Sequence, residues 1–167
     1  MIAEQPRIIP PALATVSFVV YGKAQPAGSK RHVPVRRKAD GQWIPTGKTL
    51  VIDANPKAKD WKDRVAKEAG LAMDGRALLV GPVELVVTFH RSRPRAHYGT
   101  GRNVGRLRKS APKYPTSRPD ATKLLRGVED AMNGVVWRDD SQVCRQIVEK
   151  LFGESAAVEV AVREIEE

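Results

Sequence analysis

The chain has 167 residues, which is long enough for one domain with a substantial apolar core, and 41% of its residues are hydrophobic. That apolar fraction excludes a disordered chain. The net charge is +10 and the sequence pI is about 10.0, so an acidic polymer is the favoured partner. The one cysteine, Cys144, excludes an intramolecular disulfide and a cysteine-rich zinc site.

The ends of the chain carry few signals. Residues 1–14 contain three prolines and are expected to form a flexible lead-in. Residues 15–167 are expected to form a single domain, since they contain no internal repeat and no domain boundary. The sequence has no secretory signal pattern and no apolar run long enough to cross a bilayer, so we expect a cytoplasmic protein without membrane contact.

The first predicted strand covers Thr15–Tyr21, where β-branched and aromatic residues dominate. It runs into a loop at 22–31 that is punctuated by glycine and proline and ends in Lys30 and Arg31. Exposed N–H groups in such a loop can hold a phosphate oxygen, and a plain surface turn is the alternative interpretation. The two cations make this loop a candidate DNA contact.

Residues 32–53 are predicted to form a hairpin. Asp40-Gly41 is a strong tight-turn dipeptide, and a second turn is predicted at Thr46-Gly47-Lys48. Asn55-Pro56 then predicts the start of a helix that runs to about Met73. The residues expected on its inner face are Trp61, Val65, Ala69 and Ala72.

Three further strands complete the predicted sheet. Residues 82–90 alternate between apolar and mixed positions, which predicts a half-buried strand. Residues 142–152 and 156–165 also have strand character, and the alternation around Val158–Val162 suits a sheet edge or a solvent-facing strand. The sum is an α+β fold with a mixed sheet of about five or six strands and two main helices on one face.

The segment 91–118 is strongly basic and contains no acidic residue. Its prolines and glycines argue against regular structure, and His97, Tyr98 and Tyr114 offer rings for stacking on bases. We expect it to fold onto a phosphate backbone and to bring that backbone to the acids that follow. Its candidate DNA-binding residues are Arg91, Arg93, Arg95, Arg102, Arg106, Arg108, Lys109, Lys113 and Arg118.

The stretch 118–143 organises the rest of the chain. Pro119-Asp120 predicts a helix start, with the aspartate capping the free N–H groups, and apolar residues recur at helical spacing up to Met132. Asn133-Gly134 predicts the end of this helix, and the acidic pair Asp139-Asp140 follows after a short apolar run. Acids on both sides of a helix, next to a basic segment, are what a site for metal and phosphate requires.

These motifs resemble the RusA-like Holliday junction resolvases (crossover junction endodeoxyribonucleases). The resemblance rests on Pro119-Asp120, on the helix that ends in Asp130-Ala131-Met132-Asn133-Gly134, and on Asp139-Asp140-Ser141-Gln142-Val143. The loop at 22–31 is also similar to the family's first loop. The resemblance implies a homodimer, often encoded by phages or prophages, that binds four-way DNA junctions in recombination and repair. Such enzymes nick two strands symmetrically with Mg²⁺ or Mn²⁺.

The resemblance also implies roles for individual residues. Asp120 and Asp140 match the family's first and last essential aspartates, and Arg126 stands where the family has a lysine, so these three are the candidate catalytic residues. The family pattern Asp-x-Asp-Asn is here Asp120-Ala121-Thr122-Lys123, which lacks one carboxylate. Our hypothesis is that Asp139 joins Asp120 and Asp140 as the third metal ligand. Thr122 would cap the helix or bond in the outer shell, and Lys123, also a candidate DNA contact, would fill the space of a second metal.

Simpler interpretations remain for each acid. Asp120 alone is typical of a helix cap, Asp139-Asp140 of a turn, and Glu129 and Asp130 of surface pairs, Asp130 with Arg126. Two alternative functions also remain. The missing carboxylate favours a catalytically silent junction-binding protein, and the charge alone is compatible with a basic RNA-binding structural protein.

Overall fold

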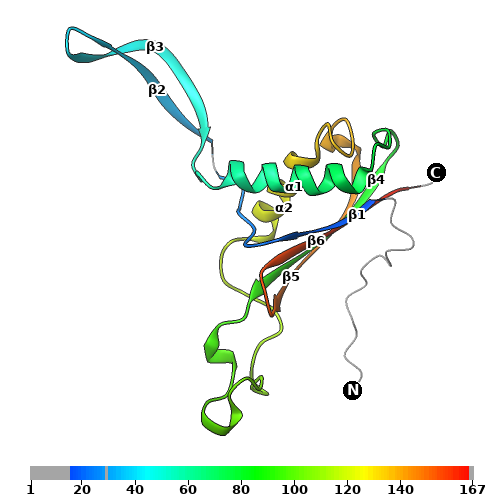
Figure 1. Ribbon diagram of the computed structural model, residues 1–167. Coiled ribbons are helices and arrows are strands. Elements are labelled where there is room, and N and C mark those ends of the chain that lie inside the picture. The colour runs from blue at the N-terminus through cyan, green and yellow to red at the C-terminus, as the bar shows by residue number, and fades with distance from the viewer. Residues whose placement is uncertain (1–15, 29, 166–167) are drawn as a thin grey trace.

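The computed structural model describes residues 16–28 and 30–165 of the chain (Figure 1). The lead-in expected at residues 1–14 lies outside this range. The strands are β1 (Val16–Tyr21), β2 (Lys30–Ala39), β3 (Gln42–Asp53), β4 (Val83–Ser92), β5 (Val143–Gly153) and β6 (Ala157–Glu164). The α-helices are α1 (Ala58–Met73) and α2 (Ala121–Met132). Neither helix is long and apolar enough to cross a membrane.

The predicted α+β fold is confirmed, with its strands divided between two sheets. A four-stranded sheet has the order β1-β6-β4-β5, and β2 pairs with β3 alone. Only β4 and β5 of the larger sheet run parallel; the other neighbours are antiparallel. Both helices lie on the same face of this sheet, where they pack on each other and on its strands (Figure 1). The predicted inner face of α1 is correct, since Trp61, Val65 and Ala69 are buried.

The prediction that the last strand lies at a sheet edge or faces solvent is wrong. β6 pairs with β1 on one side and with β4 on the other, so it lies inside the sheet. Val158, Val160 and Val162 point into the core beneath the helices. The alternation in the sequence is real: the opposite face of β6 carries Glu159 and Arg163, which are partly exposed, and Ala161, which packs against Val86.

The strand β4 is buried on both faces, where only half burial was predicted. All residues from Val83 to Phe89 are buried, Glu84 and Thr88 included. The Glu84 carboxylate receives hydrogen bonds from Arg145 Nη1 at 3.0 Å and from Arg163 Nε at 2.7 Å. Burial favours the neutral form of Glu84, but the two guanidinium groups outweigh it and hold the pKa of this carboxyl below its usual value. Charged partners on β5 and β6 therefore let an acid occupy the middle of the sheet.

The predicted hairpin is confirmed and forms a long arm that extends away from the larger sheet (Figure 1). Asp40 and Gly41 turn it with φ of 49° and 79°, as a tight hairpin requires. The second predicted turn, at Thr46-Gly47-Lys48, is instead a bulge inside β3. These three residues lie opposite Val35, and the Thr46 hydroxyl donates to the Val35 carbonyl at 2.8 Å. A glycine with positive φ serves a bulge as well as a turn, which explains the error.

The basic segment folds as an irregular excursion between β4 and α2, as its composition predicts. It contains short 3₁₀ turns at Arg95–His97 and Gly101–Asn103, and isolated bridges join Tyr98 to Leu107 and Gly99 to Val104. The Phe152 N–H of β5 donates to the Lys113 carbonyl at 3.1 Å, which ties the end of the excursion back to the sheet.

Candidate functional site

The helix α2 begins at the predicted place, but Asp120 does not cap it with its side chain. Asp120 has the extended backbone of an N-cap residue, and its carboxylate makes no capping hydrogen bond. This carboxylate is 61% exposed and lies 3.8 Å from the Lys123 ammonium. Because the carboxylate is not used for capping, it remains available to a cation or to water at the end of the helix.

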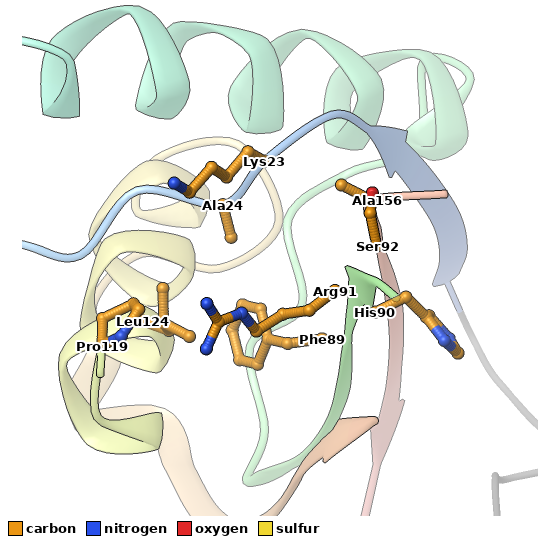
Figure 2. Close-up of a pocket in the computed structure, with 9 residues that line it drawn as sticks. All are labelled: Lys23, Ala24, Phe89, His90, Arg91, Ser92, Pro119, Leu124 and Ala156. Atoms are coloured by element: carbon orange, nitrogen blue, oxygen red, sulfur yellow. The ribbon is translucent and has the colours of Figure 1, made fainter. Parts of the chain in front are cut away.

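Two cations fix the turn that presents Asp120. Arg91 Nη1 donates to the Ser117 carbonyl at 3.3 Å, to the Ser117 hydroxyl at 3.0 Å and to the Arg118 carbonyl at 3.1 Å. Lys150 Nζ donates to the carbonyls of Ser117 and Pro119 at 3.3 and 3.1 Å. Figure 2 shows Arg91 reaching across a cavity of about 230 Å³ toward Pro119. Arg91, predicted to bind DNA, thus holds the backbone just before the first acid.

The first loop packs directly on α2. The Ala27 N–H donates to the Lys123 carbonyl at 2.8 Å, and a side chain at Gly127 would come within 3.2 Å of the Gln25 carbonyl. The amide of Asn55 fixes the other side of this loop by donating to the Pro26 carbonyl at 3.1 Å. The N–H groups of Gly22 and Ala27 are therefore engaged within the protein, so those two do not serve the predicted phosphate contact. The loop instead forms a wall beside the acids.

Two open clefts lie between this loop and α2. The first, of about 450 Å³, is lined by Asp120 together with Lys23, Arg118 and Lys123. The second, of about 330 Å³, lies further along α2 and brings together one face of the helix and β5. Its polar lining residues are Thr122, Lys123, Arg126, Glu129 and Gln146. Lys123 borders both clefts, so its side chain lies between the cleft of Asp120 and the cleft of Glu129.

The two acids of the predicted pair have different roles. Asp139 caps a 3₁₀ turn over Asp140–Gln142: its Oδ1 accepts from the Ser141 N–H at 2.9 Å. The Ser141 side chain, together with this backbone bond, lowers the pKa of the Asp139 carboxyl. Gln142 anchors the turn by donating to the carbonyls of Leu79 and Gly81 at 2.9 and 3.1 Å. Within the described residues no hydrogen bond or ion pair engages the Asp140 carboxylate.

Glu129 is the acid that the sequence analysis missed. It lies on the second cleft, half-buried, and receives a short hydrogen bond from Gln146 of β5. Burial and the nearby charge of Asp140 raise the pKa of its carboxyl. The predicted surface pairing of Glu129 and Asp130 needs correction, because the partner of Asp130 is Lys62 of α1 at 2.7 Å. The sequence did contain a signal for Glu129. It lies seven residues after Thr122, and this spacing places both residues on one face of the helix.

Two contacts of these acids are seen in the structure. Asp120 lies beside Lys123 on one cleft, and Glu129 lies near Asp140 by the other. In the described part of the chain no three histidine, cysteine or acidic side chains come close enough to hold one metal ion together. Magnesium often binds proteins through one or two carboxylates and takes its remaining ligands from water and substrate phosphates. The Glu129–Asp140 pair fits that requirement.

Comparison with known proteins decides the family. A sequence model described as "Endodeoxyribonuclease RusA" matches residues 24–163. The chain belongs to the RusA family. It is also 30% identical over 150 residues to a Bacillus subtilis (strain 168) protein named "Uncharacterized protein YqaN", an alignment that covers 90% of this chain and 96% of the relative. Membership in the RusA family implies endodeoxyribonuclease activity and DNA as the partner.

In this RusA-family chain the predicted DNA-binding residues fall into two groups. Three of them, all in the basic segment, also hold the protein's own backbone. Arg91 is described above, Arg93 donates to the Pro112 carbonyl at 2.8 Å, and Arg108 donates to the Tyr98 carbonyl at 2.9 Å. The remaining nine, all exposed, are Lys30, Arg31, Arg95, Arg102, Arg106, Lys109, Lys113, Arg118 and Lys123.

The predicted stacking residues also differ from one another. The His97 ring packs edge-on against Phe152 with centroids 4.8 Å apart, which leaves Tyr114 as the most exposed of the three rings.

Proposed function

We propose that this chain is a metal-dependent crossover junction endodeoxyribonuclease that binds four-way DNA junctions and resolves them by paired symmetric nicks. The observation that carries the proposal is the Asp120 carboxylate, which stands at the start of α2 without a capping bond and is bordered by cations. A helix N-terminus with basic neighbours favours a phosphate, and an acid there whose side chain does not cap the helix can orient water beside that phosphate. The family's endonuclease activity agrees with this chemistry.

The proposed metal is Mg²⁺ or Mn²⁺, and oxygen ligands suit both. Glu129 and Asp140 would hold it beside the second cleft, with water and substrate phosphate as its remaining ligands, while the Asp139 carboxylate holds the turn through its Oδ1. When bound, the metal would polarise a phosphate oxygen and lower the pKa of an attacking water. Asp120 would bind and orient water at the neighbouring cleft, at the end of the turn held by Arg91 and Lys150.

Arg126 and Lys123 supply the positive charge. Both border the second cleft, where they can bind the non-bridging oxygens of the scissile phosphate and stabilise the charge that develops on them. Arg126 offers a bidentate fork, although it is a poorer proton donor than a lysine would be. The Lys123 ammonium lies 3.8 Å from the Asp120 carboxylate. It therefore already supplies the positive charge that a second metal ion would bring there. This supports one metal per site.

Thr122 tests that assignment. Substituting Thr122→Asp adds a carboxylate to the second cleft, one turn before Arg126. If Glu129 already compensates for the missing acid, Thr122→Asp leaves cleavage and Mn²⁺ affinity within a few-fold of the natural chain. A large gain in both would mean that the natural site lacks a ligand.

A homodimer follows from the proposed reaction. A four-way junction is symmetric and needs two cuts, so two copies of one site related by a twofold axis match it. We further propose that the protein is encoded by a phage or prophage and acts in the cytoplasm, in recombination or repair.

The test is cleavage of a labelled synthetic four-way junction, with linear duplex and duplex RNA beside it. The proposal expects cleavage of the junction on addition of Mg²⁺ or Mn²⁺ to protein stripped by a chelator, and little cleavage of the duplexes. Tight junction binding without cleavage in either metal would favour the catalytically silent binder, for which the missing carboxylate at Thr122 is the motivating observation. Preference for duplex RNA would favour the RNA-binding protein.

A further inference from the structure

The β2–β3 arm, residues 30–53, has no assigned role. Its two strands pair with each other and with no strand of the larger sheet. Figure 1 shows it reaching away from the sheet and the helices, joined to them at the start of α1. A two-stranded ribbon is only marginally stable by itself in water, so an arm of this length is expected to bind something.

The pairing of β2 with β3 gives the arm two unlike faces. Lys38 lies directly opposite Trp43, and Arg36 lies opposite Pro45, two residues nearer the base. Because side chains alternate along a strand, Arg36, Lys38 and Trp43 share one face near the tip. Trp43 is 64% exposed there. The other face is more apolar, with Ile44 and Leu50 exposed, and it also carries Arg37 opposite Ile44.

The arm is also the most cationic regular element. It holds six lysines and arginines against two aspartates, a net charge of +4 over its 24 residues. None of the ion pairs between described residues involves Arg36, Arg37 or Lys38. Exposed cations on an element that projects into solvent, with an exposed tryptophan among them, match the chemistry of DNA: phosphates for the charges and a sugar or base for the ring.

We propose that the arm is a second DNA-binding element, which lies along a groove of a duplex with its Arg36–Lys38–Trp43 face against the DNA. The inference rests on the proposed function, since it takes DNA as the substrate. The major groove of B-DNA is about 12 Å wide and admits a two-stranded ribbon. The cations contact phosphates on the groove walls, and Trp43 packs against a sugar or base.

A second copy of the chain is the competing occupant, because the apolar face of the arm could pair with another arm. The charge argues against it: two arms of +4 each would repel at close approach, whereas DNA carries one negative charge per about 1.7 Å of helix axis. Ribbon width, charge and the exposed ring together favour DNA.

The experiment compares two double variants that remove the same charge. Arg36→Ala with Lys38→Ala strips the arm, and Lys59→Ala with Lys67→Ala strips exposed positions on α1. Binding to a labelled duplex and a four-way junction is measured by anisotropy over a series of salt concentrations, in Ca²⁺ or chelator to block cleavage. Far-UV circular dichroism confirms that each variant is folded.

The arm variant is expected to lower the slope of log affinity against log salt by about 1.8 on both DNAs, because each lost phosphate contact removes about 0.9. The α1 variant should leave the slope nearly unchanged. Trp43→Ala should weaken binding about tenfold with little change in slope, as expected for loss of a ring that contacts sugar or base.

Three outcomes would overturn the proposal. If the natural chain binds DNA and the arm variant binds it equally well with the same salt slope, the arm has no role in binding and the proposed function still stands. An unchanged slope together with an altered sedimentation coefficient would assign the arm to a second copy. A natural chain that binds neither DNA would refute the proposed function, and with it the inference.

Discussion

Arg91→Ala is predicted to slow cleavage without weakening DNA binding. Arg91 Nη1 donates to Ser117 and Arg118, the residues just before Pro119 and Asp120. A hydrogen bond from a charged donor contributes about 1.5–3 kcal/mol net, and solvent exposure places this set near the lower limit. Lys150 still holds part of the turn, so we take about 1.5 kcal/mol as the loss. Since 1.4 kcal/mol is a factor of ten, the properly placed Asp120 becomes about tenfold rarer.

The assay is single-turnover cleavage of a labelled junction with protein in excess, measured beside binding in Ca²⁺. Arg95→Ala is the matched control, an exposed arginine of the same segment. It should lower the salt slope of binding by about 0.9 and leave the single-turnover rate at saturation unchanged. If Arg91→Ala behaves like Arg95→Ala, then Arg91 contacts phosphate, as its sequence context indicates, and the structural role argued from its bonds to Ser117 and Arg118 is wrong.

Three further predictions concern stability and metal binding. Glu84→Gln should lower the free energy of unfolding in urea by about 1–2 kcal/mol at neutral pH. Because the pKa of Glu84 is lowered in the folded state, the natural chain loses this extra stability as pH falls below about 4.5, so the two chains should become more alike in acid. A stability difference that does not change with pH would contradict the role given to the Glu84 charge. Gly28→Ala places a Cβ 2.7 Å from the Asn55 nitrogen and should cost about 1–3 kcal/mol by thermal unfolding. As its control, Gly70→Ala, at an exposed position of α1 with its nearest neighbour at 3.9 Å, should stabilise by about 0.5–1 kcal/mol. Glu129→Gln should weaken Mn²⁺ binding by calorimetry about tenfold or more, and unchanged affinity would remove Glu129 from the proposed ligands.

Local patterns in the sequence were sufficient to predict α2 and the acids around it. Each signal there involves only neighbouring residues: the apolar spacing from Leu124 to Met132, the helix end at Asn133-Gly134 and the acidic pair Asp139-Asp140. The turn at Asp40-Gly41 and the buried face of α1 were predicted for the same reason. Interactions between neighbours in sequence fix these features, so one window of the chain contains the information.

The errors occurred where distant segments meet. The burial of Glu84 depends on Arg145 and Arg163, which reach β4 only because β5 and β6 flank it. The approach of Glu129 to Asp140 depends on Gln142, which anchors the acidic turn to Leu79 and Gly81. No local pattern encodes these contacts.

Asp140 is proposed to act at the reacting phosphate, while its neighbour Asp139 shapes the turn. The most direct test is paired-nick cleavage of a four-way junction in Mg²⁺ or Mn²⁺ by Asp140→Asn and Asp139→Asn, with junction binding measured in parallel. We predict that Asp140→Asn binds the junction and makes no nicks, whereas Asp139→Asn is less stable to heat and still makes paired nicks at a reduced rate. Undiminished cleavage by Asp140→Asn would remove Asp140 from the reacting site.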